Sequence, residues 1–150
     1  KDLALYRLAS PVDVTPLPIA SDTSLTENDT IITVGHPQLL TGYGLFTVMG
    51  GRYKSIQHQA MMMRLHTSPG NSGGPIVDTE GHIVGINSAC EPSLPSLMQP
   101  MAFLAGPSPL EILDQIVTWQ DCQYQTAAPG STIIEYLEKW GVLSEVTIIE

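Results

Sequence analysis

The sequence predicts a mainly β fold, in which a barrel of short strands is followed by two helices near the C-terminus. Its 13 glycines and 12 prolines are spread among short apolar runs over all 150 residues. Frequent turn residues between short β-branched runs are typical of barrels and favour one over a helical bundle. With 43% hydrophobic and 14% charged residues, the chain is long enough to bury one core.

Six strands are expected in the barrel, each of them a short apolar or alternating run bounded by turn residues. Gly50-Gly51 marks one turn and Glu80-Gly81 marks another. Alternation along residues 60–65 places Met61, Met63 and Leu65 on one face, where methionines are expected to fill the core. The expected strands are 30–34, 45–49, 60–65, 75–77, 82–87 and 101–104, and a proline-containing linker is expected over 11–24.

Two helices are expected because two segments begin with the same capping pattern. Ser108-Pro-Leu-Glu111 and Thr132-Ile-Ile-Glu135 each place a hydroxyl residue three positions before a glutamate, as a capping box does. Proline at the first helical position supports a helix over 110–118, and Gly141 would end the second helix. This second helix has one apolar face, which is expected to pack on the barrel or, alternatively, to dock a partner; the face comprises Ile133, Ile134, Leu137 and Trp140.

The most informative motif is the turn Gly70-Asn-Ser-Gly-Gly74, which carries Ser72. Glycine permits backbone angles that a Cβ forbids, so the N–H groups of Gly70 and Ser72 can converge on one oxygen. A serine nucleophile needs a base to take its proton and donors to stabilise the resulting oxyanion. The turn therefore indicates a nucleophilic Ser72 with an oxyanion hole at Gly70 and Ser72; the alternative is a tight turn that happens to contain a serine.

The same residues fit the Gly-x-Ser-x-Gly pattern of an α/β-hydrolase nucleophile elbow. That elbow requires a helix to start directly after the serine. Here Pro75 follows, and two β-branched runs flank the turn at Glu80-Gly81, which predicts a hairpin. The elbow is therefore excluded.

Several segments together resemble the HtrA (Deg) branch of the trypsin-like serine peptidases, over roughly residues 1–118. Residues 101–104, which precede a Pro-Ser pair and an expected helix, are similar to the last strand of that branch. The resemblance implies the second six-stranded barrel of a two-barrel fold, with residues 3–8 as the last strand of the first barrel. The segments that carry it are Asp2-Leu-Ala-Leu-Tyr-Arg-Leu8, Thr30-Ile-Ile-Thr-Val-Gly-His-Pro37, Ser68-Pro-Gly-Asn-Ser-Gly-Gly-Pro-Ile-Val77 and Gly81-His-Ile-Val-Gly-Ile-Asn87.

The resemblance also assigns catalytic roles: Asp2 would orient a histidine, and Ser72 would attack the peptide carbonyl. Trypsin-like enzymes carry these groups in the order His, Asp, Ser, and no histidine precedes Asp2. We therefore expect the histidine upstream, in a longer parent chain, and expect these 150 residues alone to be inactive. The implied organisation is a first-barrel strand and linker over 1–20, the second barrel over 21–106 and a helical extension over 107–150.

The pocket for the substrate side chain before the cut is implied by the same resemblance. In this fold it is lined by residues just before the nucleophile turn and by the strand after it. Asn71 stands where digestive trypsins carry an aspartate that pairs with a new N-terminus, so activation of that kind is not expected. The expected pocket residues are His66 and Thr67, with His66 alternatively a structural or surface residue, and Asn87, Ser88 and Ala89.

The other histidines and the cysteines give weaker signals. His36 ends an expected strand, His58 lies in an expected loop and His82 lies on a hairpin strand. Clustered ligands at short spacing, which a metal site needs, are not seen, and no cofactor is expected. Cys90 and Cys122 allow either a disulfide or two thiols.

Charge and hydropathy restrict the partners. A net charge of −9 makes nucleic acid a poor partner, and no apolar run approaches the ~20 residues of a membrane span. The expected partners are a polypeptide substrate and the upstream barrel. We predict a serine endopeptidase that acts through an acyl-enzyme on Ser72; the alternative is a non-catalytic barrel that serves as a peptide-binding or scaffold module. Secreted, periplasmic and organellar locations all remain open.

Overall fold

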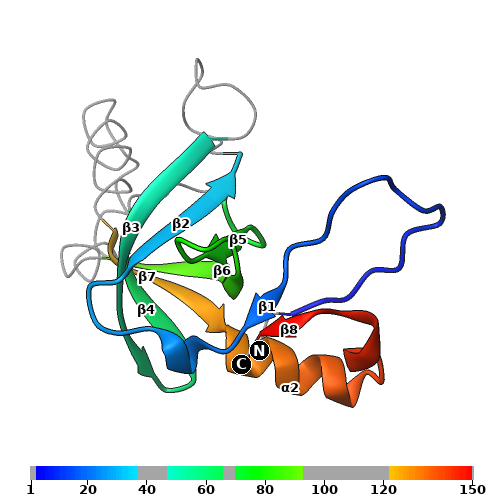
Figure 1. The fold of residues 1–150 in the computed structure, drawn as a ribbon. Coiled ribbons are helices and arrows are strands. Elements are labelled where there is room, and N and C mark those ends of the chain that lie inside the picture. The colour runs from blue at the N-terminus through cyan, green and yellow to red at the C-terminus, as the bar shows by residue number, and fades with distance from the viewer. Residues whose placement is uncertain (1–2, 37–46, 66–69, 93–121, 150) are drawn as a thin grey trace, which may run out of the picture.

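Six antiparallel strands close into a barrel, as Figure 1 shows, in the order β5-β2-β3-β4-β7-β6, and β6 pairs back with β5. This computed structural model describes residues 3–36, 47–65, 70–92 and 122–149. The prediction of a mainly β, six-stranded barrel is confirmed. The strands are β2 (Thr30–Gly35), β3 (Thr47–Gln57), β4 (Ala60–Leu65), β5 (Pro75–Val77), β6 (Ile83–Pro92) and β7 (Cys122–Pro129).

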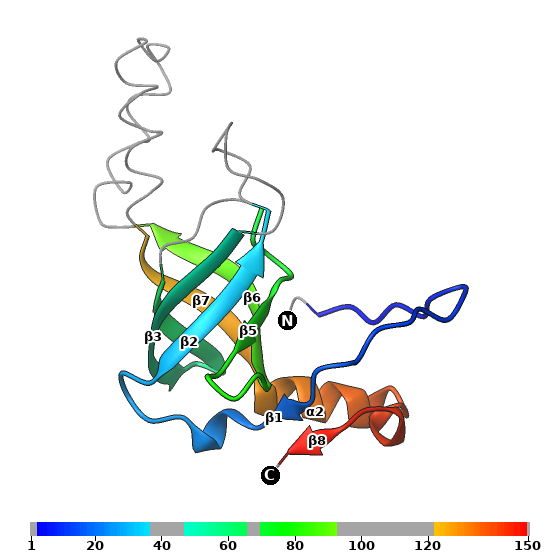
Figure 2. The same ribbon diagram turned by 45° about the horizontal axis from the view of Figure 1, so that its top comes forward.

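Further short elements gather at one end of the barrel, as Figure 2 shows. Strand β1 (Ile19–Ala20) pairs in parallel with β6 and with β8 (Ile148–Ile149). The helix α2 (Gly130–Lys139) contacts β1, β6 and β7. Two 3-10 helices, η1 (Asp22–Ser24) and η3 (Leu143–Glu145), also contact α2.

The barrel core forms because alternate residues of each strand face inward. Met61 and Met63 of β4 are completely buried, and Leu65 is 4% exposed, which confirms the prediction that this face fills the core. Ile76 of β5 and Val84 of β6 belong to the same buried core cluster. Burying side chains of this size contributes roughly 1.5–3 kcal/mol each before the entropy of folding is subtracted.

The predicted turn at Gly50-Gly51 is wrong, because both glycines lie inside the eleven-residue strand β3, where they pair with β2. A Cβ on Gly51 would lie 2.4 Å from the Arg64 carbonyl oxygen and 2.6 Å from Leu65 Cδ1. Glycine is therefore required there for close packing against β4. The chain reverses instead at His58-Gln59, where φ is 50° and 63°, which makes a two-residue hairpin turn with both φ angles positive.

The sixth strand of the barrel is β7, which the sequence did not predict as a strand. It pairs with both β4 and β6, so the barrel extends beyond its predicted end at residue 106, into the segment assigned to a helical extension. The predicted strand over 101–104 lies outside the described residues. The buried positions of β7 carry Gln125, Ala127 and Pro129. These three positions hold no large β-branched or aromatic side chain, so the inward face of the strand lacks the pattern by which strands are recognised.

The described residues contain one α-helix rather than the two predicted; the segment 110–118 lies outside them. Helix α2 begins at Gly130, not at the predicted capping box, and Thr132 is buried inside its first turn. Its start is stabilised from a distance, because the Ser131 N–H donates to Asp22 Oδ1 at 2.7 Å. The Asp22 carboxylate, which lies far upstream in the sequence, thus accepts a hydrogen bond from the helix N-terminus as a local capping side chain would.

The predicted end of α2 at Gly141 is confirmed. Gly141 has φ of 72°, and its N–H donates to the Glu138 carbonyl at 2.9 Å. The Val142 N–H donates to the Leu137 carbonyl at 3.0 Å, which completes a Schellman motif. Ile133 and Leu137 are buried, so the apolar face packs on the barrel end, while Trp140 is 39% exposed and makes an edge contact with Tyr136.

The predicted strand over residues 3–8 is not formed. Residues 3–18 contain no strand, and Leu5, Tyr6 and Leu8 are exposed. Figure 1 shows this segment as an irregular loop that extends away from the barrel. A strand needs a partner edge, and none of the described strands pairs with these residues.

Cys90 and Cys122 lie on neighbouring strands but are not cross-strand partners. The register of β6 and β7 pairs Cys90 with Gln125 and Cys122 with Pro92. Two residues of offset correspond to roughly 6–7 Å along a strand. The sequence left a disulfide and two thiols open, and both stay open because these two side chains lie outside the described ones.

Candidate active site

The glycine-rich turn before β5 presents Ser72 at the surface. Gly70 and Gly73 have φ of 108° and 83°, a region that residues with a Cβ rarely adopt. Ser72 is exposed, whereas its neighbour Asn71 is 1% exposed. The two glycines thus allow the chain to bury one residue and expose the next within a single turn.

Hydrogen bonds fasten this turn to β6. The Gly73 N–H donates to the Asn87 carbonyl at 2.7 Å, and the Asn87 N–H donates to the Gly74 carbonyl at 2.9 Å. Ser72 Oγ donates to the Ser88 carbonyl at 3.0 Å. Because β5 and β6 form a hairpin, the strand that follows the turn returns to hold it in place.

The backbone N–H groups of the turn fall into two sets. The N–H groups of Gly73 and Gly74 donate to backbone carbonyls. The Gly73 N–H binds the Asn87 carbonyl, and the Gly74 N–H binds the Asn71 carbonyl at 3.0 Å. Those of Gly70 and Ser72 have no recorded hydrogen-bond acceptor among the described residues. Two N–H groups beside an exposed hydroxyl are the donors that an oxyanion hole requires.

Asn71 joins the turn to the end of β2. A Cβ on Gly35 would lie 2.1 Å from Asn71 Oδ1, so this contact requires glycine at position 35. Asn71 Nδ2 donates only weakly, to Met49 Sδ at 3.7 Å, and Asn71 Oδ1 is buried without a partner in the described structure. An unpaired buried oxygen costs about 1–3 kcal/mol, and the fold tolerates that cost directly beside Ser72.

Only some of the predicted site residues are described. Ser72 and Gly70 share the turn, and Ser88 contributes the carbonyl that Ser72 Oγ binds. Asn87 is 1% exposed, and its Nδ2 donates to the Asn71 carbonyl at 3.1 Å. Sequence reasoning assigned Asn87 only to the pocket wall and missed this bond. Outside the described residues or side chains lie Asp2, His66, Thr67 and Ala89, so the pocket stays a prediction.

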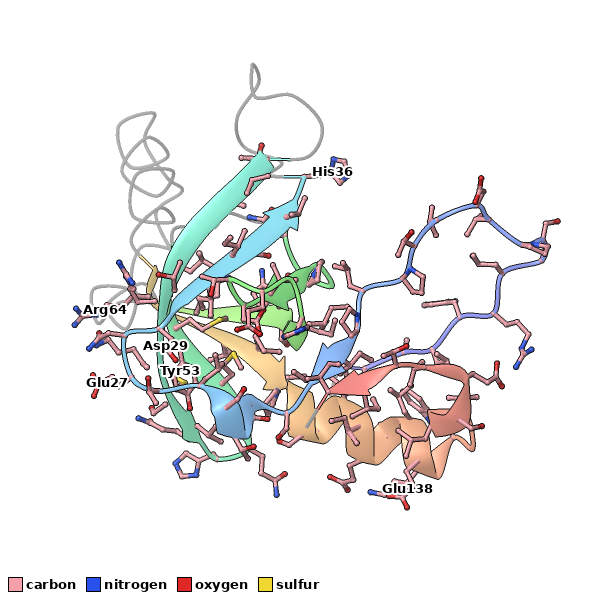
Figure 3. The ribbon with its side chains drawn as sticks, in the orientation of Figure 1. Glu27, Asp29, His36, Tyr53, Arg64 and Glu138 are labelled. Atoms are coloured by element: carbon pink, nitrogen blue, oxygen red, sulfur yellow. The ribbon has the colours of Figure 1, made fainter. Side chains whose placement is uncertain are left out.

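No hydrogen bond from Ser72 to a histidine is recorded among the described residues. His36 follows β2 at the barrel end opposite α2, as Figure 3 shows, where Glu138 marks the helix. His58 lies in the β3–β4 turn. His82 Nδ1 lies 2.9 Å from Asp78 Oδ2, in the turn between β5 and β6. The position of His58 agrees with the predicted loop, whereas His82 lies in the turn directly before β6 and not on the predicted hairpin strand.

The charge of Asp78 is stabilised in this β5–β6 turn. Burial alone would raise the pKa of Asp78, but hydrogen bonds from the backbone and ring of His82 and from the Glu80 N–H lower it below 3.8. The two N–H groups donate to Oδ1 at 2.8 and 2.9 Å. These contacts hold the hairpin closed and give Asp78 a structural role.

A cavity of about 230 Å³ lies between η1, the β5–β6 turn and β8. Leu25, Asp29 and His82 are among its lining residues, and no residue of the Ser72 turn is. Within the described ranges, no three His, Cys, Asp or Glu residues are arranged to hold a metal ion. None of the helices described is long and apolar enough to cross a membrane.

A six-stranded antiparallel barrel with an exposed serine on a glycine-rich turn, directly before a barrel hairpin, is the arrangement of a trypsin-like domain. Residues 1–86 match the family described as the trypsin-like peptidase domain. This match covers more than half of the chain, and the chain therefore belongs to that family. The predicted resemblance to its HtrA branch is confirmed by relatives from that branch.

Three curated relatives show the range of similarity. The chain is 29% identical over 98 residues to Protease Do-like 1, chloroplastic, of Arabidopsis thaliana, covering 59% of this chain and 22% of the relative. It is 32% identical over 100 residues to a probable periplasmic serine protease do/HhoA-like of Haemophilus influenzae, covering 59% and 20%. It is 30% identical over 92 residues to the anti-sigma-I factor RsgI9 of Acetivibrio thermocellus, covering 59% and 12%. The chain thus spans about a fifth or less of these proteins.

Solved structures share the fold. The HtrA-type protease AlgW with a tripeptide superposes with a TM-score of 0.60 at 18% identity, covering 91% of this chain and 39% of AlgW. An inactive form of Rv3671c from M. tuberculosis H37Rv gives a TM-score of 0.55 at 16% identity, covering 86% and 55%. At these identities the likeness establishes the trypsin-like barrel and nothing finer.

Proposed function

We propose that this chain carries the nucleophile of a serine endopeptidase that cuts polypeptides through an acyl-enzyme on Ser72, as part of a longer parent chain. The observation that carries the proposal is the turn itself. It exposes the Ser72 hydroxyl beside two N–H groups that have no acceptor in the described structure. Membership of the trypsin-like peptidase family supports the same conclusion.

The proposed reaction follows from these groups. Ser72 Oγ bonds to the substrate carbonyl carbon while its proton passes to a base, and the carbonyl oxygen becomes an oxyanion held by the N–H groups of Gly70 and Ser72. The base returns the proton to the leaving amine, and water then releases the acyl group from Ser72. We assign the base to a histidine upstream in the parent chain, oriented by Asp2.

The proposed substrate is an extended polypeptide. Relatives in the HtrA branch are named as serine proteases, and one similar protein was solved with a tripeptide. We propose that the side chain before the cut is received by the predicted pocket residues, which are His66, Thr67, Asn87, Ser88 and Ala89. The upstream barrel is the proposed partner, since the cleft of a two-barrel peptidase lies between its barrels.

The proposal is tested by following hydrolysis of unfolded casein by the parent protein. Ser72→Ala should abolish turnover, whereas Ser131→Ala, at an exposed serine of α2, should leave it unchanged. Normal turnover by Ser72→Ala would overturn the proposal. The 150-residue chain alone should be inactive, because it lacks the general base that typically contributes roughly 10²–10⁴-fold.

A second candidate function is a non-catalytic barrel that binds peptides or serves as a scaffold. One observation favours it, because a relative at 30% identity is named as an anti-sigma factor rather than a protease. The segment upstream of this chain distinguishes the two. A histidine at a strand end there supports the peptidase, and its absence supports the scaffold.

A further inference from the structure

We propose that Asn87 is a positioning residue that fixes the direction of the Ser72 backbone N–H, one donor of the oxyanion hole. The inference rests on the proposed function, because it concerns the oxyanion hole of the proposed active site. Sequence reasoning did not assign this role to Asn87. It starts from the Asn71 carbonyl, which belongs to the same peptide group as the Ser72 N–H.

Two donors hold the Asn71 carbonyl oxygen. The Gly74 N–H reaches it at 3.0 Å, and Asn87 Nδ2 reaches it at 3.1 Å. A carbonyl oxygen has two lone pairs, so these two bonds use its full capacity. One donor comes from the turn itself and the other from β6, and together they hold the oxygen toward the barrel.

The direction of the Ser72 N–H follows from the planarity of the peptide group. No cis peptide bond occurs in the described chain, and in a trans peptide the C=O and N–H point in opposite directions. With the Asn71 oxygen held toward β6, the Ser72 N–H must point away from it. The absence of an acceptor for this N–H among the described residues agrees with that direction.

Asn87 is well placed for this role because it is itself fixed. Its own N–H and carbonyl both bond to the turn, at Gly74 and Gly73, and its side chain is almost completely buried. Within the described residues, Asn87 Oδ1 has no hydrogen-bond partner, while Asn87 Nδ2 donates to the Asn71 carbonyl. An apolar side chain of the same shape would avoid the unpaired oxygen, which indicates that the amide serves the turn rather than the core.

The role predicts a kinetic signature. An oxyanion donor acts on charge that develops in the transition state, so a misdirected Ser72 N–H should lower kcat and leave KM nearly unchanged. A general loss of stability would instead reduce the fraction of folded protein. Turnover per folded molecule therefore separates positioning from structural support.

The first experiment measures amide hydrogen exchange in this chain by NMR. Asn87→Leu removes the donor while retaining a branched side chain of similar size, and Asn87→Ala replaces it if the leucine variant does not fold. Exchange of the Gly74 N–H, which bonds the same carbonyl, should accelerate by about tenfold or more relative to core amides such as that of Val84. The matched control is Thr33→Val, at a completely buried residue of β2 whose hydroxyl has no partner among the residues that the structure describes, and it should leave Gly74 exchange unchanged. Unchanged Gly74 exchange in the Asn87 variant would overturn the inference.

The second experiment measures kcat and KM of the parent protein, with active sites counted by titration. Asn87→Leu should lower kcat by about 10- to 100-fold with KM within about twofold, a part of the effect of losing an oxyanion donor outright, and Thr33→Val should alter neither. Full kcat in Asn87→Leu, together with inactivity of Ser72→Ala, would refute the positioning role alone. Retained turnover by Ser72→Ala would refute the proposed function itself.

Discussion

A methyl group added at the end of β2 should disturb the Ser72 turn, although Gly35 is remote from Ser72 in sequence. In Gly35→Ala the new Cβ would lie 2.1 Å from Asn71 Oδ1, 2.8 Å from its Cγ and 3.0 Å from its Cα. Asn71 is 1% exposed, so its side chain cannot relieve the contact by turning into solvent. The turn must shift as a whole, and the carbonyl that Asn87 holds must shift with it.

The magnitude follows from two opposing effects. Overpacking a well-packed site costs roughly 1–3 kcal/mol, while replacing glycine by alanine lowers the entropy of the unfolded chain and returns about 0.4–1 kcal/mol. Gly35→Ala should therefore reduce the free energy of unfolding by roughly 1–2 kcal/mol. Gly50→Ala is the matched control, because its Cβ would meet nothing within 4 Å; it should be neutral or slightly stabilising.

Urea denaturation of both variants of this chain measures the difference directly. The same pair in the parent protein should differ in the rate at which a fluorophosphonate modifies Ser72, with only Gly35→Ala slowed. If Gly35→Ala is as stable and as reactive as Gly50→Ala, then the packing of Asn71 against β2 does not support the turn.

Three further predictions concern the support of the barrel. Asp22→Ala should lower the free energy of unfolding by about 1 kcal/mol, measured in urea, because the Ser131 N–H of α2 loses its acceptor; an unchanged midpoint would contradict the distant cap. Gln59→Gly should raise the free energy of unfolding by roughly 1 kcal/mol, because φ of 63° strains a residue that has a Cβ. A lower thermal midpoint for this variant would contradict the expected relief of strain. Since the folded-state pKa of Asp78 is lowered, its stabilisation is present above its unfolded pKa and lost as pH falls through the folded value. Asp78→Asn should weaken that acid-dependent loss, and identical pH profiles of unfolding would refute the assignment.

Much of the barrel could be predicted because its strands carry the expected patterns. Residues 60–65 and 75–77 were predicted with the same limits as β4 and β5, since each is an apolar or alternating run that ends at a polar or turn residue. Strand β7 was not predicted because its buried positions carry Gln125 and Ala127. These residues pair and pack well in a closed barrel but give no local hydrophobic pattern. Gly50-Gly51 was wrongly predicted as a turn because glycine is a strong local turn signal. Here the close contact of Gly51 with β4 requires a glycine inside a strand.

The candidate site, like the barrel, could be predicted from the sequence only in part. The nucleophile turn could be recognised from Ser72 and its glycines, because positive φ angles and an exposed hydroxyl are encoded locally. The support of that turn could not, because it depends on Asn87 and Gly35, each of which meets Asn71 only after the barrel closes. Residues that bond or pack across strands in this way leave no trace in local spacing.

The central claim, that Ser72 is the nucleophile, is tested most directly by mapping where a fluorophosphonate attaches to the parent protein. Peptide mass spectrometry should find one adduct, on Ser72, and the adduct should be absent from Ser72→Ala while Ser131→Ala retains it. An adduct on a different residue, or equal labelling of Ser72→Ala, would contradict the claim.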